Sequence, residues 1–506
     1  PLAEYLIASS HNTYLEGHQL RGESSVEAYE AAFAKTCRCV EIDLWDGPDG
    51  EPIVYHGHTL TSKITAHKVL KAIARCAFAG DNDTPVILSL ENHCGVPQQD
   101  AFAKQLLIVF GDRIADAFPS NSSPLPSPQA LAGKVLIKGK ITAGAAREAT
   151  ADDLVSPTTP TADSISAAPP PDAAAAAASA AATAANQQVV MTGSEAKDAY
   201  KDEDKKDKKK GKGKKDKKDK KAAEADKISD ALTALTHLGT FKCAAAGAEA
   251  LKQSGTAALS GGRPSRMMFS LSEAKVLKLV GAGACSSDEG LANSRAVGAA
   301  TDHAALAVLQ RYNAQHITRT YPKGTRFGSS NYSPLPGWHS GCQLVALNYQ
   351  TPGLPMWLNR ALFSLNRGCG YVLKPRWMAA GEEPPADGHR ELEVRVVAGG
   401  HLRTASTDPR TANLSVAVTL FGYLDNCHQF RTAAVYGNTW NPRWGETASF
   451  RVVAPEISLL QFAVHNDAGA AATDGTTDST LLAQCTVPVA AIRPGYRAVP
   501  LSNPQT

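Results

Sequence analysis

Two stretches that alternate short apolar strands with helical patterns lie on either side of a low-complexity segment. Before it, strand patterns occur at residues 39–44, 53–56, 85–90 and 135–137, and after it at 266–270, 316–321, 342–348 and 370–373. Alternating strands and helices are typical of a parallel sheet covered by helices. Four strands on each side predict one α/β barrel of the TIM type, (β/α)8, with its halves in residues 1–142 and 225–380.

The interrupting segment, residues 143–224, has the composition of a linker. It contains a Ser/Pro-rich stretch and an alanine tract, and it ends in a lysine-rich run. Residues 201–221 hold 13 lysines and 6 acids, a local charge of +7. Polar tracts of this kind bury too little apolar surface to fold. We therefore expect a long disordered linker inside a single barrel.

Strict alternation of apolar and polar residues begins after residue 388 and recurs at 392–396, 414–420 and 460–464. A period of two over several such segments is typical of an all-β sandwich. Residues 388–506 are therefore predicted to form a separate sandwich domain.

Helical spacing of apolar residues is seen once on each side of the linker. The two sets are Ala66, Leu70, Ile73 and Ala77, and then Ile228, Leu232, Leu235 and Leu238. Apolar residues three and four positions apart share one face of a helix. Each set predicts one helix that packs on the barrel.

The overall charge excludes some partners. With 52 basic and 49 acidic residues the formal charge is +3, which does not indicate a nucleic-acid-binding protein. The ten cysteines form no CxxC pair, as expected of reduced thiols in the cytosol. The sequence has no run of about 18 strongly apolar residues, so we expect no membrane-spanning helix.

A pair of acids stands out in the first half. Glu41 and Asp43 alternate with apolar residues, so both point to the same side of the predicted strand. Two carboxylates facing one cavity are costly unless a proton, a salt bridge or a hard cation neutralises them. Asn12 and Glu91 offer further oxygen ligands, and the set suggests calcium. A purely structural carboxylate pair at the barrel rim is the alternative.

Histidines and cations supply the other candidates. His11 and His56 both lie where predicted strands end, the end of a barrel at which catalytic groups collect. Either could instead be an ordinary hydrogen-bonded histidine. Lys138 and Lys140 share one side of a strand and suit a phosphate, although a solvated strand edge explains them equally well.

In the second half, Arg319 and Tyr321 share one face of the predicted strand at 316–321. The guanidinium can bind an anion through two parallel hydrogen bonds, and the tyrosine offers a flat ring. This pair suits a phosphorylated ring compound.

Several motifs together resemble the X region of eukaryotic phosphoinositide-specific phospholipase C. They are SHNTYL at 10–15, VEIDLWDG at 40–47, YHG at 55–57, ILSLENHC at 87–94 and LIKGK at 136–140. Motifs of the second half resemble the Y region of the same family. They are SSNYSP at 329–334, GCQLVALN at 341–348, QTPG at 350–353 and GCGYVLKP at 368–375. WNPRW at 440–444 resembles the C2 domain that follows in this family.

The resemblance implies a calcium-dependent phosphodiesterase. Its substrate would be phosphatidylinositol 4,5-bisphosphate, cleaved through a cyclic phosphodiester to diacylglycerol and inositol 1,4,5-trisphosphate in intracellular signalling. The family's calcium ligands fall on Asn12, Glu41, Asp43 and Glu91, its catalytic histidines on His11 and His56, and its phosphate-binding and ring-packing groups on Lys138, Lys140, Ser270, Arg319 and Tyr321. Glu41 is also the candidate base for the attacking hydroxyl.

The sequence departs from the family in two places. VHNDA at 464–468 replaces an acidic cluster of the C2 domain, so Asp408, Asp467 and Asp478 are the acids available there. We therefore favour a sandwich that supports the barrel over a second calcium site. FSLSE at 269–273 leaves Ser270 or Ser272 as the phosphate-binding serine.

The resemblance also implies a location and partners. We expect a cytoplasmic protein that associates peripherally with the inner face of the plasma membrane and binds phosphoinositides in an anionic bilayer. The sequence identifies no upstream activator. In relatives the linker is often acidic and covers the active site, whereas the +7 run predicts recruitment to anionic lipid, with a passive spacer as the alternative.

Two other functions compete with the enzyme. An inactive lipid-binding scaffold would have lost a catalytic histidine or a calcium ligand, and all of these are present. A phosphodiesterase for another substrate would lack the phosphate-binding set of Lys138, Lys140 and Arg319. The sequence therefore favours the phosphoinositide enzyme.

Overall fold

The computed structural model of the chain describes residues 1–118, 124–141, 227–241, 243, 248–260, 264–280, 302–402, 410–424, 426–467 and 479–504. The predicted linker at 143–224 and its lysine-rich run lie outside these residues.

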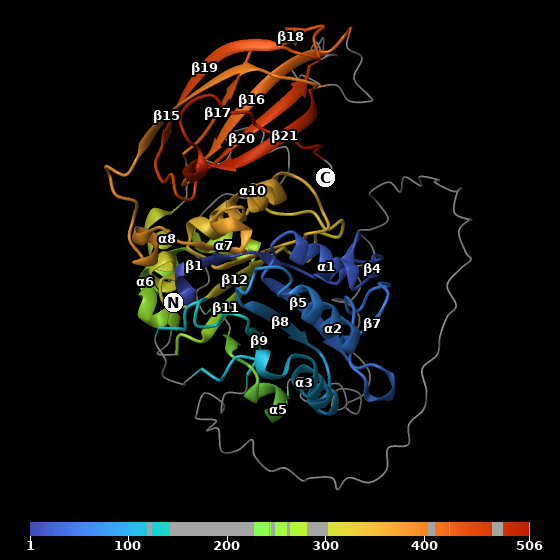
Figure 1. Cartoon of the computed structure of the whole chain (residues 1–506). Coiled ribbons are helices and arrows are strands. Elements are labelled where there is room, and N and C mark those ends of the chain that lie inside the picture. Colours follow the sequence, from blue (N-terminus) through green and yellow to red (C-terminus); the bar gives the residue numbers. More distant parts are fainter. Residues whose placement is uncertain are drawn as a thin grey trace, which may run out of the picture. The chain divides into compact units, whose positions relative to one another are not determined.

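Eight parallel strands close a barrel in the described part of the chain (Figure 1). In the order in which neighbours pair, they are β2 (Ser9–Ser10), β13 (Leu344–Leu347), β12 (Thr318–Tyr321), β11 (Met267–Ser272), β10 (Leu238–Phe241), β9 (Val135–Gly139), β8 (Val86–Asn92) and β5 (Cys39–Trp45). Pairing of β2 with β5 closes the ring. The predicted (β/α)8 barrel is confirmed.

Two of the strands predicted for the barrel are wrong. Residues 53–56 form β6 (Ile53–Val54), which pairs antiparallel with β5 and with β7 (Ile64–Thr65) outside the ring. Residues 370–373 form β14 (Tyr371–Leu373), which pairs antiparallel with β1 (Tyr5–Ile7). Their places in the ring are taken by β2 and β10, which the apolar pattern did not reveal. A further small hairpin joins β3 (Leu15–Glu16) to β4 (Glu23–Ser24).

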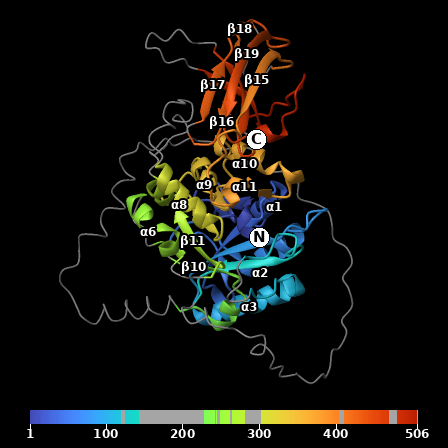
Figure 2. The same cartoon turned by 90° about the vertical axis from the view of Figure 1, so that its left-hand side faces the viewer.

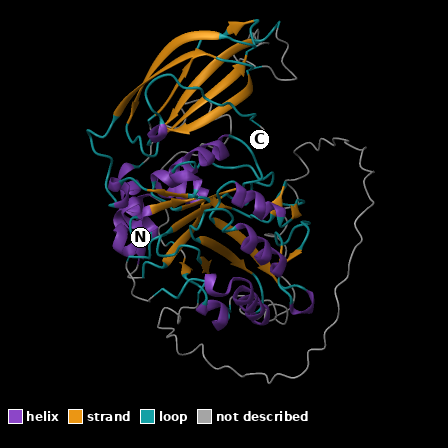
Figure 3. Cartoon of the chain, viewed as in Figure 1, coloured by secondary structure: helices purple, strands orange, loops and turns teal. Residues whose placement is uncertain are grey.

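Helices surround the ring (Figures 1, 2 and 3). They are α1 (Glu27–Ala34), α2 (Ala66–Cys76), α3 (Val96–Phe110), α5 (Asp230–Ala234), α6 (Ala248–Ser260), α7 (Glu273–Val280), α8 (His303–Asn313), α9 (Leu335–His339), α10 (Leu354–Phe363) and α11 (Arg376–Ala379), with short 3-10 turns at Leu2–Glu4, Pro48–Gly50, Gly111–Arg113 and Asn366–Gly368. A further 3-10 turn, Val489–Ala491, follows the last strand of the C-terminal region.

Only one of the two predicted helices has the predicted extent. Helix α2 forms as expected: the Thr65 side chain caps it, and Leu70 and Ile73 are fully buried. The second helix is wrong in extent. Ser229 caps α5, which ends at Ala234, because Leu238 already belongs to the barrel strand β10.

Alternate residues of the barrel strands enter two different cores. Val40, Leu88 and Ile137 join the large cluster that packs strands against helices. Cys39, Ile87 and Leu136, one position earlier on each strand, join a smaller separate cluster. Apolar side chains thus fill the interior near the amino ends of these strands, while their later positions on the same face are polar.

The C-terminal region is the predicted all-β sandwich, which Figure 3 shows as strands and loops almost throughout. Strand β15 (Arg390–Ala398) pairs with β19 (Arg443–Val452), and β16 (Asn413–Phe421) pairs with β17 (Cys427–Arg431), β18 (Val435–Tyr436) and β20 (Leu459–Asn466), which in turn pairs with β21 (Thr480–Pro488). Its core includes Leu414, Val418, Phe450 and Leu460.

Pairs of neighbouring barrel strands join the two halves of the chain at two places. Between β9 and β10, Lys138 pairs with Leu238, and the segment absent from the description connects these neighbours. Between β13 and β2, Leu347 pairs with Ser10, and the strands come from opposite ends of the barrel sequence. We call the second place the β13–β2 seam.

Candidate active site

Strand register brings the polar side chains of the barrel into rows. Glu41 on β5 pairs with Ser89 on β8, and Ser89 pairs with Lys138 on β9. One step closer to the carboxyl ends, Asp43 pairs with Glu91. Residues paired across parallel strands point to the same side of the sheet. The apolar residues between them fix the opposite face in the core, so these polar side chains must enter the barrel.

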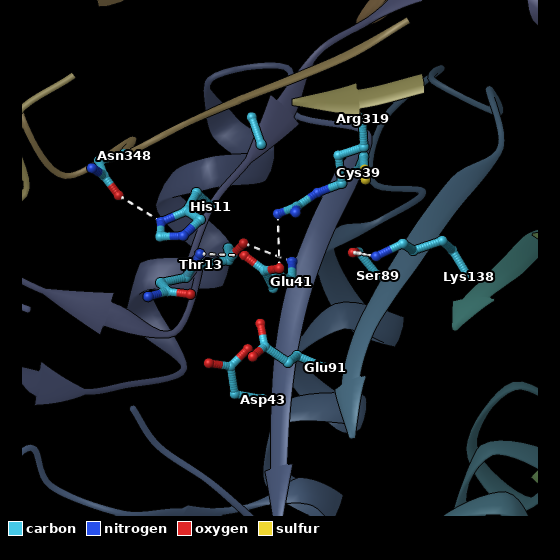
Figure 4. Close-up of polar contacts among 12 residues, drawn as sticks. His11, Thr13, Cys39, Glu41, Asp43, Ser89, Glu91, Lys138, Arg319 and Asn348 are labelled. Atoms are coloured by element: carbon cyan, nitrogen blue, oxygen red, sulfur yellow. Dashed lines mark hydrogen bonds and ion pairs between the residues drawn. The ribbon is translucent and has the colours of Figure 1, made fainter. Parts of the chain in front are cut away.

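The carboxylates of Glu41, Asp43 and Glu91 form the negative part of the site. Each offers an oxygen within 4.8 Å of the others, and Figure 4 shows them turned toward one another. The Tyr14 hydroxyl donates to Asp43 at 2.6 Å, but the buried Oδ1 of Asp43 has no partner among the described residues. Burial, Glu91 and Glu41 raise the pKa of Asp43. A cation would relieve this repulsion.

The available oxygens fit a hard divalent cation. The backbone N–H of Asn12 donates to Glu41 at 2.9 Å, which places this residue beside the carboxylates. Its Nδ2 donates to Gln19 at 2.8 Å, so Oδ1 is the atom left for a ligand. Calcium prefers carboxylate and amide oxygens of this kind. The unpaired Asp43 oxygen is the observation that supports the fit.

His93 holds the outermost carboxylate, and the sequence reasoning did not single it out. Its Nε2 lies 3.2 Å from Oε1 of Glu91, and its ring stacks on Trp45 with centroids 4.1 Å apart. The hydrogen bond to His93 lowers the pKa of Glu91 to about 2. Glu91 therefore stays ionised in neutral solution.

Two buried cations face the carboxylates. Arg319 places Nη2 2.8 Å from Glu41, and its buried Nε has no acceptor among the described residues. Lys138 donates to Ser89 at 3.1 Å, and burial together with Arg319 lowers its pKa to about 8. Donors that remain unpaired at buried cations suit an anionic ligand.

The two candidate histidines have different structural origins. His11 follows barrel strand β2, and its ring lies parallel to Tyr321 with centroids 6.4 Å apart. His56 follows β6, so the expectation that it ends a barrel strand is wrong. Burial lowers the pKa of His11, although the Glu41 charge opposes this shift.

One cavity of about 360 Å³ brings most of the predicted site residues together. Its walls include His11, Glu41, His56, Glu91, Lys138, Lys140, Ser270, Arg319 and Tyr321. Asn12 and Asp43 lie outside its lining and are 3% and 4% exposed. Ser270, rather than Ser272, faces this cavity.

The lining also contains residues that the sequence reasoning missed. Gln19, Asn348 and Lys323 are among them. Asn348 is the last letter of GCQLVALN and follows β13, so its place after a barrel strand was a usable signal. Gln19 lies in a loop without a strand pattern, and nothing local to its sequence marks it.

The sandwich offers little to a cation in its described loops. Asp467 pairs with Arg431 Nη2 at 2.6 Å through one carboxylate oxygen and accepts from Ser415 at 2.8 Å through the other. A charged arginine therefore already neutralises this acid. Asp408 and Asp478 lie outside the described residues.

Among the described residues, every helix is too short or too polar to cross a bilayer.

Family models match three parts of the chain. The X domain of phosphatidylinositol-specific phospholipase C matches residues 1–141, the Y domain of the same enzymes matches 286–377, and the C2 domain matches 390–500.

Named relatives match nearly the whole chain. The 1-phosphatidylinositol 4,5-bisphosphate phosphodiesterase delta-3 of Mus musculus is 36% identical over 99% of this chain and 54% of its own length. The zeta-1 enzyme of Rattus norvegicus is 33% identical over 99% of this chain and 71% of its own length. The chain thus spans about half the length of the delta-3 relative.

A solved structure shares the architecture. The crystal structure of PLC21 from L. pealei superposes with a TM-score of 0.67 at 29% identity and covers 100% of this chain and 54% of that one. The similarity extends over both the barrel and the sandwich.

Proposed function

The chain belongs to the phosphatidylinositol-specific phospholipase C family, and on this premise we propose that it hydrolyses phosphatidylinositol 4,5-bisphosphate. The products are diacylglycerol and inositol 1,4,5-trisphosphate. The observation that carries this proposal is the cavity whose lining combines carboxylates, histidines and buried cations. A scaffold that only bound lipid would have no use for three carboxylates within 4.8 Å of one another.

We assign the metal site to Asn12, Glu41, Asp43 and Glu91. Calcium held there supplies Lewis-acid polarisation of the attacking hydroxyl. The chain's own groups prepare this position: Tyr14 fixes the Asp43 carboxylate and His93 fixes that of Glu91. Without such partners the carboxylates would turn away from one another.

The chemistry proceeds in two steps. The 2-hydroxyl oxygen of inositol forms a bond to phosphorus, and the bond from phosphorus to the diacylglycerol oxygen breaks. Glu41, whose Oε1 lies 2.8 Å from Nη2 of Arg319, accepts the hydroxyl proton. His11 and His56 stabilise the charge that builds on the phosphoryl oxygens and give a proton to the leaving oxygen. In the second step a water oxygen forms a bond to phosphorus, and the bond from phosphorus to the inositol 2-oxygen breaks. The proton transfers of the first step run in reverse.

The cations select the headgroup. Lys138, Lys140, Ser270, Arg319 and Tyr321 line the cavity. We assign the first four to the ring phosphates and the tyrosine ring to the inositol ring. A headgroup without ring phosphates leaves Lys138 without an anionic partner and the buried Nε of Arg319 without an acceptor, which is costly. We therefore expect phosphorylated inositol lipids to be preferred.

We place the protein at the inner face of the plasma membrane as a peripheral cytoplasmic enzyme, because its substrate is a lipid of that surface. The described cysteines are free thiols, as this compartment requires. The sandwich and the basic linker supply contacts with anionic lipid that do not depend on the headgroup in the cavity.

We assign residues 143–224 to a linker between barrel halves 1–142 and 225–380, followed by a C2 domain at 388–506. Support comes from the direct pairing of β9 with β10, so that the linker leaves and returns at neighbouring strands. Deletion of residues 150–220 should therefore preserve the fold and hydrolysis of soluble substrate. Sedimentation with anionic vesicles at two salt concentrations tests recruitment, and equal binding by both proteins would favour a spacer.

The decisive experiment measures hydrolysis of phosphatidylinositol 4,5-bisphosphate with and without calcium. The wild type should be active with calcium and lose activity in excess chelator, and Glu91→Gln should need far more calcium. Lys104→Ala, an exposed change on α3, is the matched control. Hydrolysis that continues in chelator would contradict the metal assignment, and a wild type without hydrolysis would contradict the enzyme.

A further inference from the structure

The two histidines of the cavity each use one ring nitrogen for a contact inside the protein. His11 places Nδ1 3.0 Å from the side-chain Oδ1 of Asn348 (Figure 4). His56 places Nδ1 2.7 Å from the backbone carbonyl oxygen of Gln19. In both rings Nε2 is therefore the nitrogen left for a substrate.

These partners determine which nitrogen of each ring donates a hydrogen bond inside the protein. A carbonyl oxygen only accepts hydrogen bonds, so the nitrogen that faces it must carry the proton. His56 is thus held as the Nδ1–H form by Gln19. His11 is held in the same form provided that Asn348 presents its oxygen rather than its NH₂ group to the ring.

The surroundings of Asn348 settle which way its amide points. Its Nδ2 donates to the carbonyl oxygen of Ser330 at 3.2 Å, which leaves Oδ1 on the side of His11. The backbone of Asn348 is fixed as well. Its N–H donates to Asn331 Oδ1 at 2.7 Å, and its carbonyl oxygen accepts from Asn331 Nδ2 at 3.0 Å. Asn348 is 1% exposed, so water does not compete for these contacts.

Gln19 is anchored to the same loop of the second half. Its backbone N–H donates to Phe327 at 2.8 Å, and its Nε2 donates to Ser329 at 2.8 Å. Its Oε1 accepts from Asn12 at 2.8 Å. The carbonyl that faces His56 is thus fixed from both halves of the barrel.

We propose that Asn348 and Gln19 are positioning residues that accept a hydrogen bond from Nδ1 of His11 and His56 and so direct Nε2–H of each protonated ring toward the substrate. This inference rests on the proposed function, because it assigns how that reaction's histidines are oriented. Neither residue touches the reacting atoms in this assignment. Their effect is on turnover, since a ring that turns away from this orientation cannot direct its Nε2 proton toward the leaving oxygen.

Two substitutions at Asn348 separate positioning from stability. Asn348→Leu removes the acceptor of His11 at similar volume, and kcat should fall about 10- to 100-fold with KM nearly unchanged, as for other supporting contacts of catalytic groups. Asn348→Asp keeps an oxygen for His11 but turns its other oxygen toward the Ser330 carbonyl. Asp should therefore restore turnover relative to Leu, although it costs more stability.

A merely structural role predicts the opposite order. A buried carboxylate facing a carbonyl destabilises the fold more than a leucine does, so Asp would then be the less active variant. Thermal melting of both variants measures the stability term separately. If Asn348→Leu does not fold, Asn348→Ala replaces it and should show the same low turnover.

Asn313 provides the matched control. It is also buried, its Nδ2 donates to the backbone oxygen of Ser340 at 2.8 Å, and its Oδ1 accepts from Thr318 at 2.6 Å. Asn313→Asp and Asn313→Leu should lower the melting temperature and leave the kcat of the folded protein unchanged. The wild type is assayed alongside: its inactivity would overturn the proposed function, whereas an active wild type with Asp no better than Leu at Asn348 would overturn the positioning role.

Discussion

The two ends of the barrel bury polar side chains in opposite ways. At the amino ends of the strands, Nζ of Lys374 donates to the carbonyl oxygens of Ala3 at 2.7 Å and Asn313 at 3.0 Å. Gln343 donates to three backbone carbonyls and accepts from the N–H of Thr318 at 2.9 Å. At the carboxyl ends, charged side chains face one another instead.

The comparison separates stability from function. Backbone partners satisfy Lys374 and Gln343, so these side chains fasten the ends of strands and helices to one another. Asp43 and Arg319 keep buried atoms without partners among the described residues, which a protein tolerates where a ligand completes the set. Changes at one end should therefore lower stability, and changes at the other should lower activity.

The largest expected effect is at the carboxyl ends. His56→Ala should lower kcat by about 10² to 10⁴, the range for loss of a general acid or a charge-stabilising group. Its melting temperature should stay near that of the wild type. His303→Ala, an exposed change on α8, is the control and should alter neither quantity. Unchanged turnover in His56→Ala would remove this residue from the mechanism.

The reverse pattern is expected at the amino ends. Gln343→Leu removes the side-chain partner of the buried Thr318 N–H and of three backbone carbonyls. The free energy of unfolding should therefore fall by about 2–5 kcal/mol. Urea unfolding measures this loss. The kcat of the protein that remains folded should match the wild type, and a large fall in kcat would break the proposed division between the two ends.

A smaller effect is expected where the cavity meets solvent. Lys140→Ala should reduce the preference for phosphatidylinositol 4,5-bisphosphate over phosphatidylinositol by at most about fivefold, because an exposed cation contributes at most about 1 kcal/mol to the binding of an anion. Competition between the two lipids in mixed vesicles measures it. A wild type that cleaves both lipids equally well would refute the phosphate pocket.

The last expected effect is a pH dependence at the amino ends, which is small over any single pH unit. Burial lowers the pKa of Lys374 to about 7, below its value in the unfolded chain. Above pH 7 the folded state therefore binds fewer protons, and the free energy of unfolding should rise with pH by at most about 1.4 kcal/mol per unit. Denaturation at pH 7, 8 and 9 should show a shallower slope in Lys374→Met, and equal slopes would contradict a buried neutral amine.

Alternation along single strands accounts for what could be predicted. Glu41 and Asp43 share a face because side chains alternate, and no tertiary information was needed to place them on one side of the strand. Strand β2 is only Ser9–Ser10 and carries no apolar pattern, so its place in the ring comes from pairing with β13 and β5. Strand β6 has an apolar sequence but lies outside the ring, because apolar content does not specify which strand it pairs with.

The meeting of the residues that contact the two histidines could not be predicted from local sequence patterns. Gln19 and Asn348 are 329 positions apart and meet only when the ring closes. Their local sequences give no indication of this meeting, whereas the catalytic candidates could be recognised from motifs. Contacts between distant loops depend on the register of the whole barrel, and a single sequence does not reveal that register.

The β13–β2 seam gives the cavity a second property. Residue pairing there is short, with Ala346 beside Ser9 and Leu347 beside Ser10, and the bond between His11 and Asn348 crosses the same line. A local opening of the ring at this line separates the histidine from its partner while the other strand pairs stay intact. Catalytic activity should therefore depend on closure of the ring. By linkage, an occupant of the cavity that contacts both halves should slow amide exchange along β2 and β13.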